Sequence, residues 1–147
     1  MEETLHYLLM ANHLLFQKAL LTEIKDTGLT SGQPKVLDYL RNHDGAVQKE
    51  IAAVCNIEPA TLTSVLLGME NKELIVRKML DGNRRSLYVY LTETGKMLAE
   101  RVAVEFSKIE NNAFSSFTDE EKEMLIALLR KVNKNMNHEG DVTNDKN

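Results

Sequence analysis

Two adjacent arginines, Arg84 and Arg85, lie in a short polar loop between two stretches that have the alternating pattern of β-strands. Guanidinium groups keep their positive charge, so two of them at the tip of a hairpin repel each other unless a negative group meets them. The narrow minor groove of DNA supplies such negative potential, and arginine side chains enter it. The paired arginines therefore favour a contact with double-stranded DNA over the alternative that the loop is exposed to solvent alone.

A predicted helix that begins at Pro59 carries small hydroxyl side chains near its start. It has no acidic residue as far as Met69, whereas a solvent-facing helix of an acidic protein usually carries glutamate. Hydroxyl groups suit base edges and phosphates, and the methyl group of threonine suits thymine. Threonine and serine also cap and line ordinary helices, so the residue types alone leave both roles open. The residues expected to face the major groove are Pro59, Ala60, Thr61, Thr63 and Ser64.

A short helix over residues 48–54 precedes this one, and the two have the spacing of a helix-turn-helix. The small Ala52 falls where the helices cross, and Asn56 falls at a turn that requires left-handed backbone. Leu62 falls where a buried apolar residue closes the pair. This geometry places the second helix in the major groove.

Two strands are expected on either side of the arginine loop, over residues 75–79 and 87–91. Residues 75–91 carry four basic side chains against one acidic side chain, which gives a local charge of +3 in a chain whose net charge is −4. An acidic protein with a locally basic hairpin is compatible with DNA binding, and its DNA affinity is then expected to depend strongly on salt. Further contacts with DNA are expected from Gln48 and Lys49, helped by free amide groups at a helix start, and from Arg77.

Long helical segments precede and follow this unit. Residues 3–25 have a wide apolar face, the next helix is expected to be capped by Thr30 or Ser31, and Thr92 and Thr118 open two more helices. One chain of this size cannot cover all these apolar faces, so we expect a homodimer. The predicted fold is mainly α with a small β-hairpin wing, a winged helix-turn-helix with a helical dimerisation layer. Its expected parts are an N-terminal dimerisation helix (1–30), a winged helix-turn-helix DNA-binding domain (31–91), C-terminal dimerisation helices (92–138) and a disordered tail (139–147).

The composition excludes several kinds of site. The single cysteine, Cys55, excludes an intramolecular disulfide and a zinc finger and is expected to be a small buried thiol. His6 and His13 lack the further ligands that a metal requires, so we expect neither a metal nor another cofactor. The sequence has no signal peptide and no stretch as long as a membrane span, which predicts a cytoplasmic protein without a membrane partner.

Two other functional classes compete with DNA binding. An enzyme requires paired carboxylates, a nucleophile with a base, or a phosphate-binding loop, and none occurs at a usable spacing, so we expect no enzymatic activity. A winged helix that binds protein instead of DNA suits the acidic composition and the lack of Lys and Arg in the groove-facing helix before Lys72. The paired arginines favour DNA, and a gel-shift experiment separates the two classes.

The residues around the arginine loop resemble the MarR family of winged helix-turn-helix regulators. Residues 83–95 are similar to the family's Asp-x-Arg…Leu-Thr-x-x-Gly signature, and residues 61–75 are similar to its recognition helix. The likeness covers nearly the whole chain. It implies a homodimeric transcriptional repressor, held together by its first and last helices, that binds a near-palindromic operator. It also implies that Arg85 is the wing-tip arginine and that Thr61, Thr63 and Ser64 lie among the groove-facing positions.

The chain departs from the family pattern at three places. Asn83 replaces the acidic residue that steadies the arginine loop, although Asp81 is available as a substitute. Glu73 replaces a common glycine at a helix end that favours left-handed backbone. The first helix lacks the cysteine of the family's peroxide-sensing branch, so we do not expect that mechanism.

Similar proteins release DNA when a small, often phenolic, ligand binds, and the resemblance implies such a small aromatic ligand here. In a dimer of this shape, a crevice forms where the first, second and long helices meet, and a ligand there couples to DNA affinity. Its lining is apolar with a few polar handles, as in small-molecule pockets. The same residues are equally compatible with a packed core, and the sequence leaves both roles open. They are Met10, His13, Phe16, Val36 and Tyr39.

Overall fold

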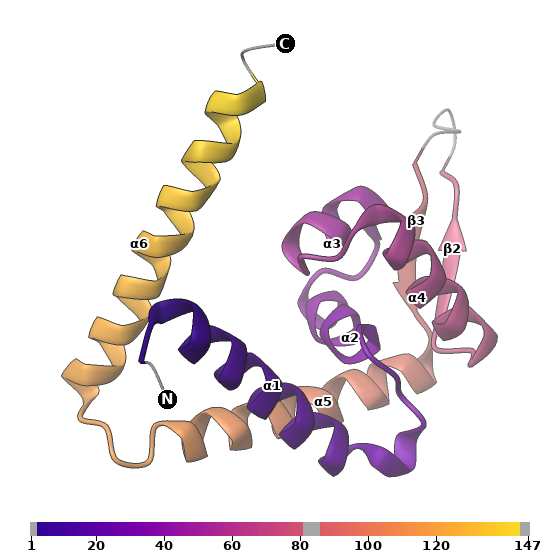
Figure 1. Cartoon of the computed structure of the whole chain (residues 1–147). Coiled ribbons are helices and arrows are strands. Elements are labelled where there is room, and N and C mark those ends of the chain that lie inside the picture. Colours follow the sequence, from indigo (N-terminus) through magenta and orange to yellow (C-terminus); the bar gives the residue numbers. More distant parts are fainter. Residues whose placement is uncertain (1–2, 81–85, 145–147) are drawn as a thin grey trace. The chain divides into compact units, whose positions relative to one another are not determined.

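The computed structural model describes residues 3–80 and 86–144, with side chains as far as Asn137. The chain forms two compact units, one extending to Ile109 and one from Glu110 onward. Both helices of the helix-turn-helix and both strands of the wing end within one residue of their predicted limits. The elements in chain order are α1 (Leu5–Glu23), the 3₁₀ turn η1 (Lys25–Thr27), α2 (Gln33–Asn42), β1 (Ala46–Val47), α3 (Gln48–Val54), α4 (Pro59–Asn71), β2 (Ile75–Lys78), β3 (Tyr88–Leu91), α5 (Glu93–Ala113) and α6 (Asp119–Asn144) (Figure 1).

A cluster of buried apolar side chains holds the first unit together. Leu62 of α4 is fully buried, as the helix-turn-helix pattern requires. Val36, Leu37 and Leu40 form a buried stripe along α2, whereas Tyr39 is only half-buried against the same cluster. Burial of one such aliphatic side chain contributes about 1.5–3 kcal/mol. The cluster therefore fixes how α4 is presented to solvent.

The sheet has three antiparallel strands in the order β1-β3-β2. Ile75 pairs with Leu91, which joins β2 and β3 into the expected hairpin. Val89 and Leu91 are buried, so the predicted alternation along β3 is confirmed. The two-residue strand β1 was not expected. It is held by Ala46 pairing with Val89, far along the chain, and no local pattern indicates so distant a partner.

Left-handed residues end both helices of the helix-turn-helix. Asn56 follows α3 with φ 52° and Glu73 follows α4 with φ 59°. After each of them, the next N–H group donates to a carbonyl oxygen five residues earlier, at 3.0 Å. This is the Schellman arrangement, which satisfies carbonyl groups at a helix end. The predicted role of Asn56 is confirmed, and Glu73 carries a side chain in a conformation that costs about 1–2 kcal/mol for residues other than glycine.

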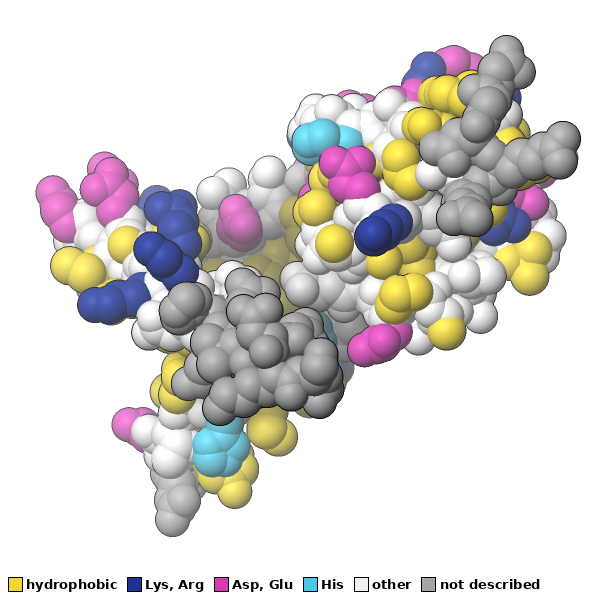
Figure 2. Space-filling view, turned by 90° about the horizontal axis from the view of Figure 1, so that it is seen from above, with side chains coloured by type: hydrophobic (Ala, Val, Ile, Leu, Met, Phe, Trp, Pro, Cys, Tyr) yellow, Lys and Arg dark blue, Asp and Glu magenta, His cyan; other side chains and the backbone are white. Residues whose placement is uncertain are grey.

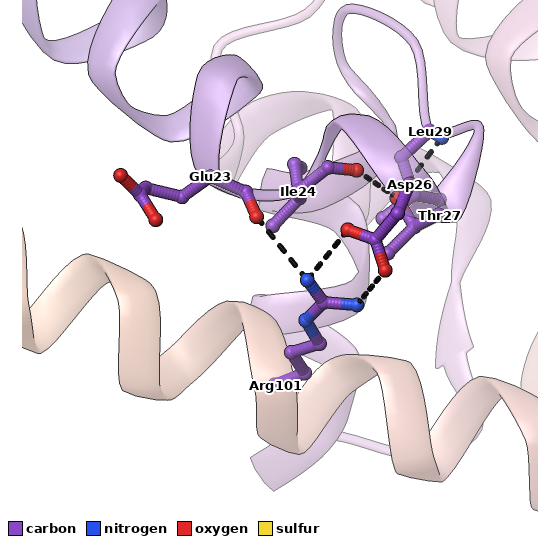
Figure 3. A network of polar contacts seen from close by, with 6 residues as sticks. All are labelled: Glu23, Ile24, Asp26, Thr27, Leu29 and Arg101. Carbon is purple, nitrogen blue, oxygen red and sulfur yellow. Dashed lines mark hydrogen bonds and ion pairs between the residues drawn. The ribbon is translucent and has the colours of Figure 1, made fainter.

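A guanidinium group from α5 holds the end of α1 and η1 in place (Figure 3). Arg101 donates to both carboxylate oxygens of Asp26, at 2.6 Å each, and to the carbonyl oxygen of Glu23 at 3.2 Å. Thr27 continues the turn, because its hydroxyl donates to the carbonyl of Ile24. The bidentate bond from Arg101 lowers the pKa of Asp26 and raises that of Arg101 itself. Both groups are accessible to solvent, so the pair orients the end of α1 and contributes only modestly to stability.

The start of α2 differs from the expected cap. Gly32, with φ 87°, precedes the helix, and no side chain bonds to the free amides of its first turn, so neither Thr30 nor Ser31 caps it. Instead, the buried side chain of Gln33 turns back, and its Oε1 accepts a hydrogen bond from the N–H of Thr30 at 3.1 Å. The loop before α2 is thereby tied to a buried amide group.

The second unit contains the last turn of α5 and the whole of α6. The expected capping box is present, because Thr118 and Glu121 each accept a hydrogen bond from the other's backbone N–H at 3.1 Å. The α6 helix continues to Asn144, past residue 138, where the sequence predicts a disordered tail. Once a helix is nucleated, each further residue adds a backbone hydrogen bond without a new nucleation cost. Across residues 3–80 and 86–144, no single helix has the length and apolar character needed to cross a membrane.

Candidate nucleic-acid interface

The helices α3 and α4 meet as a helix-turn-helix. The chain bends by 111° between them, within the range of about 90–120° for this motif. Ala52 is buried, so the small side chain at the crossing lets the two backbones approach. The buried Leu62 closes the junction from the α4 side. The packing leaves the opposite side of the first turns of α4 open to solvent.

The exposed face of α4 carries the residues predicted to enter the major groove. Pro59, Ala60, Thr61, Thr63 and Ser64 are all exposed. Gly68, further along the same helix, does not belong to this exposed face. A Cβ atom at that position would lie 2.8 Å from Nε2 of Gln33, so Gly68 faces the side chain of Gln33. The exposed residues that are predicted to face the groove therefore all lie in the first half of α4.

Gln48 and Thr63 connect the two helices of the motif on this face. The Nε2 atom of Gln48 donates to Oγ1 of Thr63 at 3.2 Å, and the Thr63 hydroxyl donates to the carbonyl oxygen of Pro59 at 3.1 Å. The Oε1 atom of Gln48 is buried and has no hydrogen-bond partner within the described residues. The amide of Gln48 thus faces the junction of α3 and α4, whereas Lys49 beside it is exposed and free to reach a phosphate.

Arg77 is engaged inside the protein. Its Nε atom lies 2.5 Å from Oε2 of Glu70, and its side chain is 18% exposed. The hydrogen bond from Arg77 lowers the pKa of Glu70, against a smaller rise caused by burial. The pair ties β2 of the wing to the last turn of α4. This geometry indicates that Arg77 orients the wing. The DNA contact that the sequence predicts for Arg77 stays a prediction.

The tip of the wing lies outside the described residues. Arg84 and Arg85 belong to it, as do Asp81 and Asn83, so their predicted roles stay predictions. Below the tip, the ammonium group of Lys78 lies 5.4 Å from the ring centre of Tyr90 on the neighbouring strand. On the face shown in Figure 2, Lys and Arg side chains gather in one group at the left of the view, and elsewhere charged side chains stand among hydrophobic and uncharged ones.

A cavity of about 150 Å³ opens beside α1 in the first unit. Two of the residues predicted to bind an effector, His13 and Phe16, line it. Met10 is exposed elsewhere on α1, and Val36 is fully buried in the core. Tyr39 stacks on His43, with ring centres 4.3 Å apart, and does not reach the cavity.

The remaining lining was missed by the sequence analysis. It comes from α1, from the loop before α2, from the first turn of α2 and from α5, and comprises Gln17, Leu20, Leu21, Ser31, Gly32, Pro34, Lys35 and Phe106. The break between α1 and α2 at Gly28 is visible in the sequence, but the distance along the chain to Phe106 hides that this residue faces the same space. The lining combines apolar side chains with a few polar groups, as in small-molecule sites.

One lysine connects the wall of this cavity with the recognition helix. Lys72, directly after α4, donates to the carbonyl oxygen of Gly28 at 2.7 Å and to Oε1 of Gln33 at 2.8 Å. Gln33 also holds Thr30, and the loop between them includes the cavity residues Ser31 and Gly32. The loop that forms one side of the cavity is therefore bonded directly to the C-terminal end of α4.

Reactive side chains do not gather elsewhere in the described part of the chain. No group of three or more His, Cys, Asp or Glu side chains there is placed to hold a metal ion. Cys55 is buried, its Sγ atom lies 3.6 Å from the carbonyl oxygen of Lys35, and burial raises the pKa of the thiol. A thiol with a raised pKa is a poor nucleophile, in agreement with the predicted small buried side chain.

Comparisons with known proteins point to one family. Residues 29–87 match the model of the MarR family. The chain is 30% identical over 126 residues to the uncharacterized HTH-type transcriptional regulator YwoH of Bacillus subtilis, covering 86% of this chain and 90% of that protein. It is 32% identical over 126 residues to the HTH-type transcriptional regulator PecS of Dickeya dadantii, covering 84% of this chain and 76% of that protein.

Solved structures agree with this relationship. The fold matches a complex of Staphylococcus aureus MepR with DNA at a TM-score of 0.83 and 30% identity, over 92% of this chain and 99% of that one. It also matches a MarR family regulator from Listeria monocytogenes complexed with a 26mer DNA at a TM-score of 0.86, over 100% of this chain and 97% of that one. At 23% identity, this second likeness supports the fold alone. The signature around the wing, the helix-turn-helix geometry and these relatives lead to one conclusion: the chain belongs to the MarR family of transcriptional regulators.

Proposed function

We propose that this regulator acts as a homodimeric repressor that binds a near-palindromic operator and is released from it by a small aromatic ligand. The observation that carries the DNA-binding part is the acid-free, hydroxyl-bearing first half of α4, exposed on a rigid helix-turn-helix. The MepR relative was crystallised with DNA, which supports the same mode of action here. In this mode α4 enters the major groove and the wing follows the backbone into the minor groove.

The homodimer is supported by apolar surface that the single chain leaves exposed. In α1 the large apolar side chains from residue 5 to residue 16 are exposed, and in α6 those from residue 124 to residue 129 are exposed. Exposed apolar surface on each of these helices is typical of a protein interface. A two-fold axis through such an interface would place two copies of α4 about 34 Å apart, one helical turn of DNA. Because the two copies of α4 would be related by two-fold symmetry, they would read a near-palindromic operator.

A single aromatic ring fits the size of the cavity. An apolar cavity of about 150 Å³ holds a molecule such as benzene, and the cavity beside α1 has about this volume. Phe16 and Phe106 supply apolar surface for the ring, whereas Lys35 and His13 supply groups that attract or donate to an acidic substituent. We therefore favour weakly acidic aromatic compounds, such as benzoates and phenols, as effectors.

The bonds of Lys72 give such a ligand a route to the DNA-binding surface. A ring that enters the cavity presses on Ser31 and Gly32, and the loop that contains them is bonded to Lys72 through Gly28 and Gln33. Movement of the loop then either drags the C-terminal end of α4 or breaks these bonds. In both cases a coupling free energy links the ligand site to the DNA-binding surface. Ligand binding then lowers DNA affinity by the same factor as DNA binding lowers ligand affinity.

The experiment that tests the function uses a duplex that the wild-type protein selects from a random-sequence pool. Footprinting on this duplex should protect two half-sites one helical turn apart, and the protein should have twice the mass of its 16.7 kDa chain. Adding benzoate should then lower the affinity for the duplex. A protein that stays monomeric, or that selects no sequence, would instead fit the alternative of a winged helix that binds protein.

A further inference from the structure

The hydroxyl group of Thr63 is turned toward the protein. Its one hydrogen is donated to the carbonyl oxygen of Pro59, and one of its lone pairs accepts the N–H of Gln48. Both partners belong to the helix-turn-helix itself, one in the preceding turn of α4 and one on α3. The hydroxyl is therefore satisfied before any DNA arrives.

Thr63 is nevertheless exposed on the groove-facing side of α4. The Cβ atom of a threonine carries only a hydroxyl and a methyl group, so an inward hydroxyl leaves the methyl group as the exposed part. In helices, threonine divides between two rotamers, one of which bonds to the carbonyl of an earlier turn. The second bond, from Gln48, favours that same rotamer and fixes the direction of the methyl group.

Thr61 and Ser64, on either side, have no side-chain hydrogen bond to any other described residue. They are exposed as well, so their hydroxyl groups are free to donate to or accept from base edges and phosphates. The first half of α4 thus presents the free hydroxyl groups of Thr61 and Ser64 together with the methyl group of Thr63. Among the four bases, thymine alone offers a methyl group in the major groove.

We infer that Thr63 reads thymine through its methyl group and that Gln48 is the positioning residue that holds the methyl group in place. This inference rests on the proposed DNA-binding function and specifies the base that one residue recognises. It also gives Gln48 a role other than the phosphate contact expected from the sequence, because its Oε1 atom is buried and its Nε2 atom is bound to Thr63.

The test replaces thymine by deoxyuridine, one position at a time, in the duplex selected by the wild-type protein. Deoxyuridine keeps every hydrogen-bonding group of thymine and lacks only the methyl group, so it isolates this contact. A buried methyl group corresponds to roughly a four-fold change in affinity. We expect a loss of about this size at one thymine of each half-site and almost none at the other thymines.

Variants of Thr63 assign the loss to one side chain. Thr63→Val keeps methyl groups in both rotamers and lacks the hydroxyl, so it should bind the selected duplex nearly as well as the wild type and remain sensitive to deoxyuridine. Thr63→Ser keeps the hydroxyl and lacks the methyl, so it should bind more weakly and lose that sensitivity. Thr61→Val is the matched control, because it removes a free hydroxyl and should weaken binding without changing the response to deoxyuridine.

A variant of Gln48 tests the positioning role. Gln48→Ala should reduce the deoxyuridine effect in the wild-type background, because Thr63 then leaves its fixed rotamer. It should have no effect on the deoxyuridine response in the Thr63→Val background, where either rotamer presents a methyl group. Thermal unfolding of each variant shows whether it is folded, and all three substituted positions are exposed or partly exposed, so we expect little change.

The outcomes separate this inference from the function on which it rests. If the wild-type protein selects no sequence, both are overturned. If it selects a duplex but Thr63→Ser responds to deoxyuridine like the wild type, or Thr63→Val loses binding as strongly as Thr61→Val, the DNA-binding function stands and the methyl readout by Thr63 is wrong.

Discussion

Among the glycines whose surroundings the structure describes, Gly95 tolerates an added methyl group least. It lies in the first turn of α5 against Leu74, in the segment between α4 and β2, and a Cβ atom there would overlap the carbonyl oxygen of Leu74 and lie 3.0 Å from its carbonyl carbon. Ordinary contacts between carbon atoms are about 3.5–4.0 Å. The obstacle is backbone, which cannot rotate away, and it is fixed further because the N–H of Thr92 donates to the same carbonyl oxygen at 3.0 Å.

The expected cost of Gly95→Ala follows from these contacts. Overpacking costs about 1–3 kcal/mol. Displacing α5 also strains two hydrogen bonds of Thr92, one to Leu74 and one to the carbonyl oxygen of Glu73, each worth about 1 kcal/mol. Alanine recovers about 0.5–1 kcal/mol because it favours the helix more than glycine does. The net loss is roughly 2–4 kcal/mol, or a fall of roughly 4–16 °C in Tm for a chain of this length.

Gly28→Ala is the matched control for Gly95→Ala. Gly28 has φ 73° and open space around its Cα, so alanine there pays only the left-handed strain of about 1–2 kcal/mol. Thermal unfolding followed by circular dichroism, at one fixed protein concentration, compares both variants with the wild type. We expect Gly95→Ala to be the less stable of the two. If it unfolds within 1 °C of the wild type, the close contact between α5 and Leu74 is refuted.

Three further predictions follow from the same structure. Asp26→Asn removes the carboxylate that Arg101 binds, and because the pKa of Asp26 is lowered on folding, the variant should be less stable than the wild type at neutral pH. The difference should disappear as the pH falls below about 3.9 and through the lowered pKa, which urea unfolding at several pH values measures. Lys72→Met removes both bonds to the cavity loop, so in fluorescence anisotropy titrations benzoate should still bind but should lower operator affinity by a smaller factor than in the wild type. Replacing both Arg84 and Arg85 by alanine should weaken operator binding by about ten-fold or more, and a plot of log affinity against log salt should become flatter because fewer counterions are released.

The helices and turns of the DNA-binding unit could be predicted from the sequence because a characteristic residue type indicates each of them. Asn56 marks the left-handed turn, Leu62 marks the buried side of α4, and Thr118 with Glu121 marks the start of α6. These marks depend on residues within a few positions of one another. Their physical causes are backbone sterics and helix capping, which act over the same short distance.

The features that were missed depend on contacts between distant residues. β1 exists only because Ala46 pairs with Val89, and the start of α2 is held through Gln33 by Lys72 instead of by a local cap. The cavity lining was predicted in part, since the apolar face of α1 contains Phe16, but nothing near Phe106 in the sequence shows that it faces the same space. Tertiary packing decides these positions.

Together, α4 and the wing are expected to read a specific DNA sequence. A direct test compares the affinity of the wild-type protein for its selected duplex with its affinity for a duplex of the same composition in shuffled order, at one physiological salt concentration. The selected duplex should bind at least about 10³-fold more tightly, as for specific DNA-binding proteins in general. Equal affinity for the two duplexes would show that the protein does not read sequence.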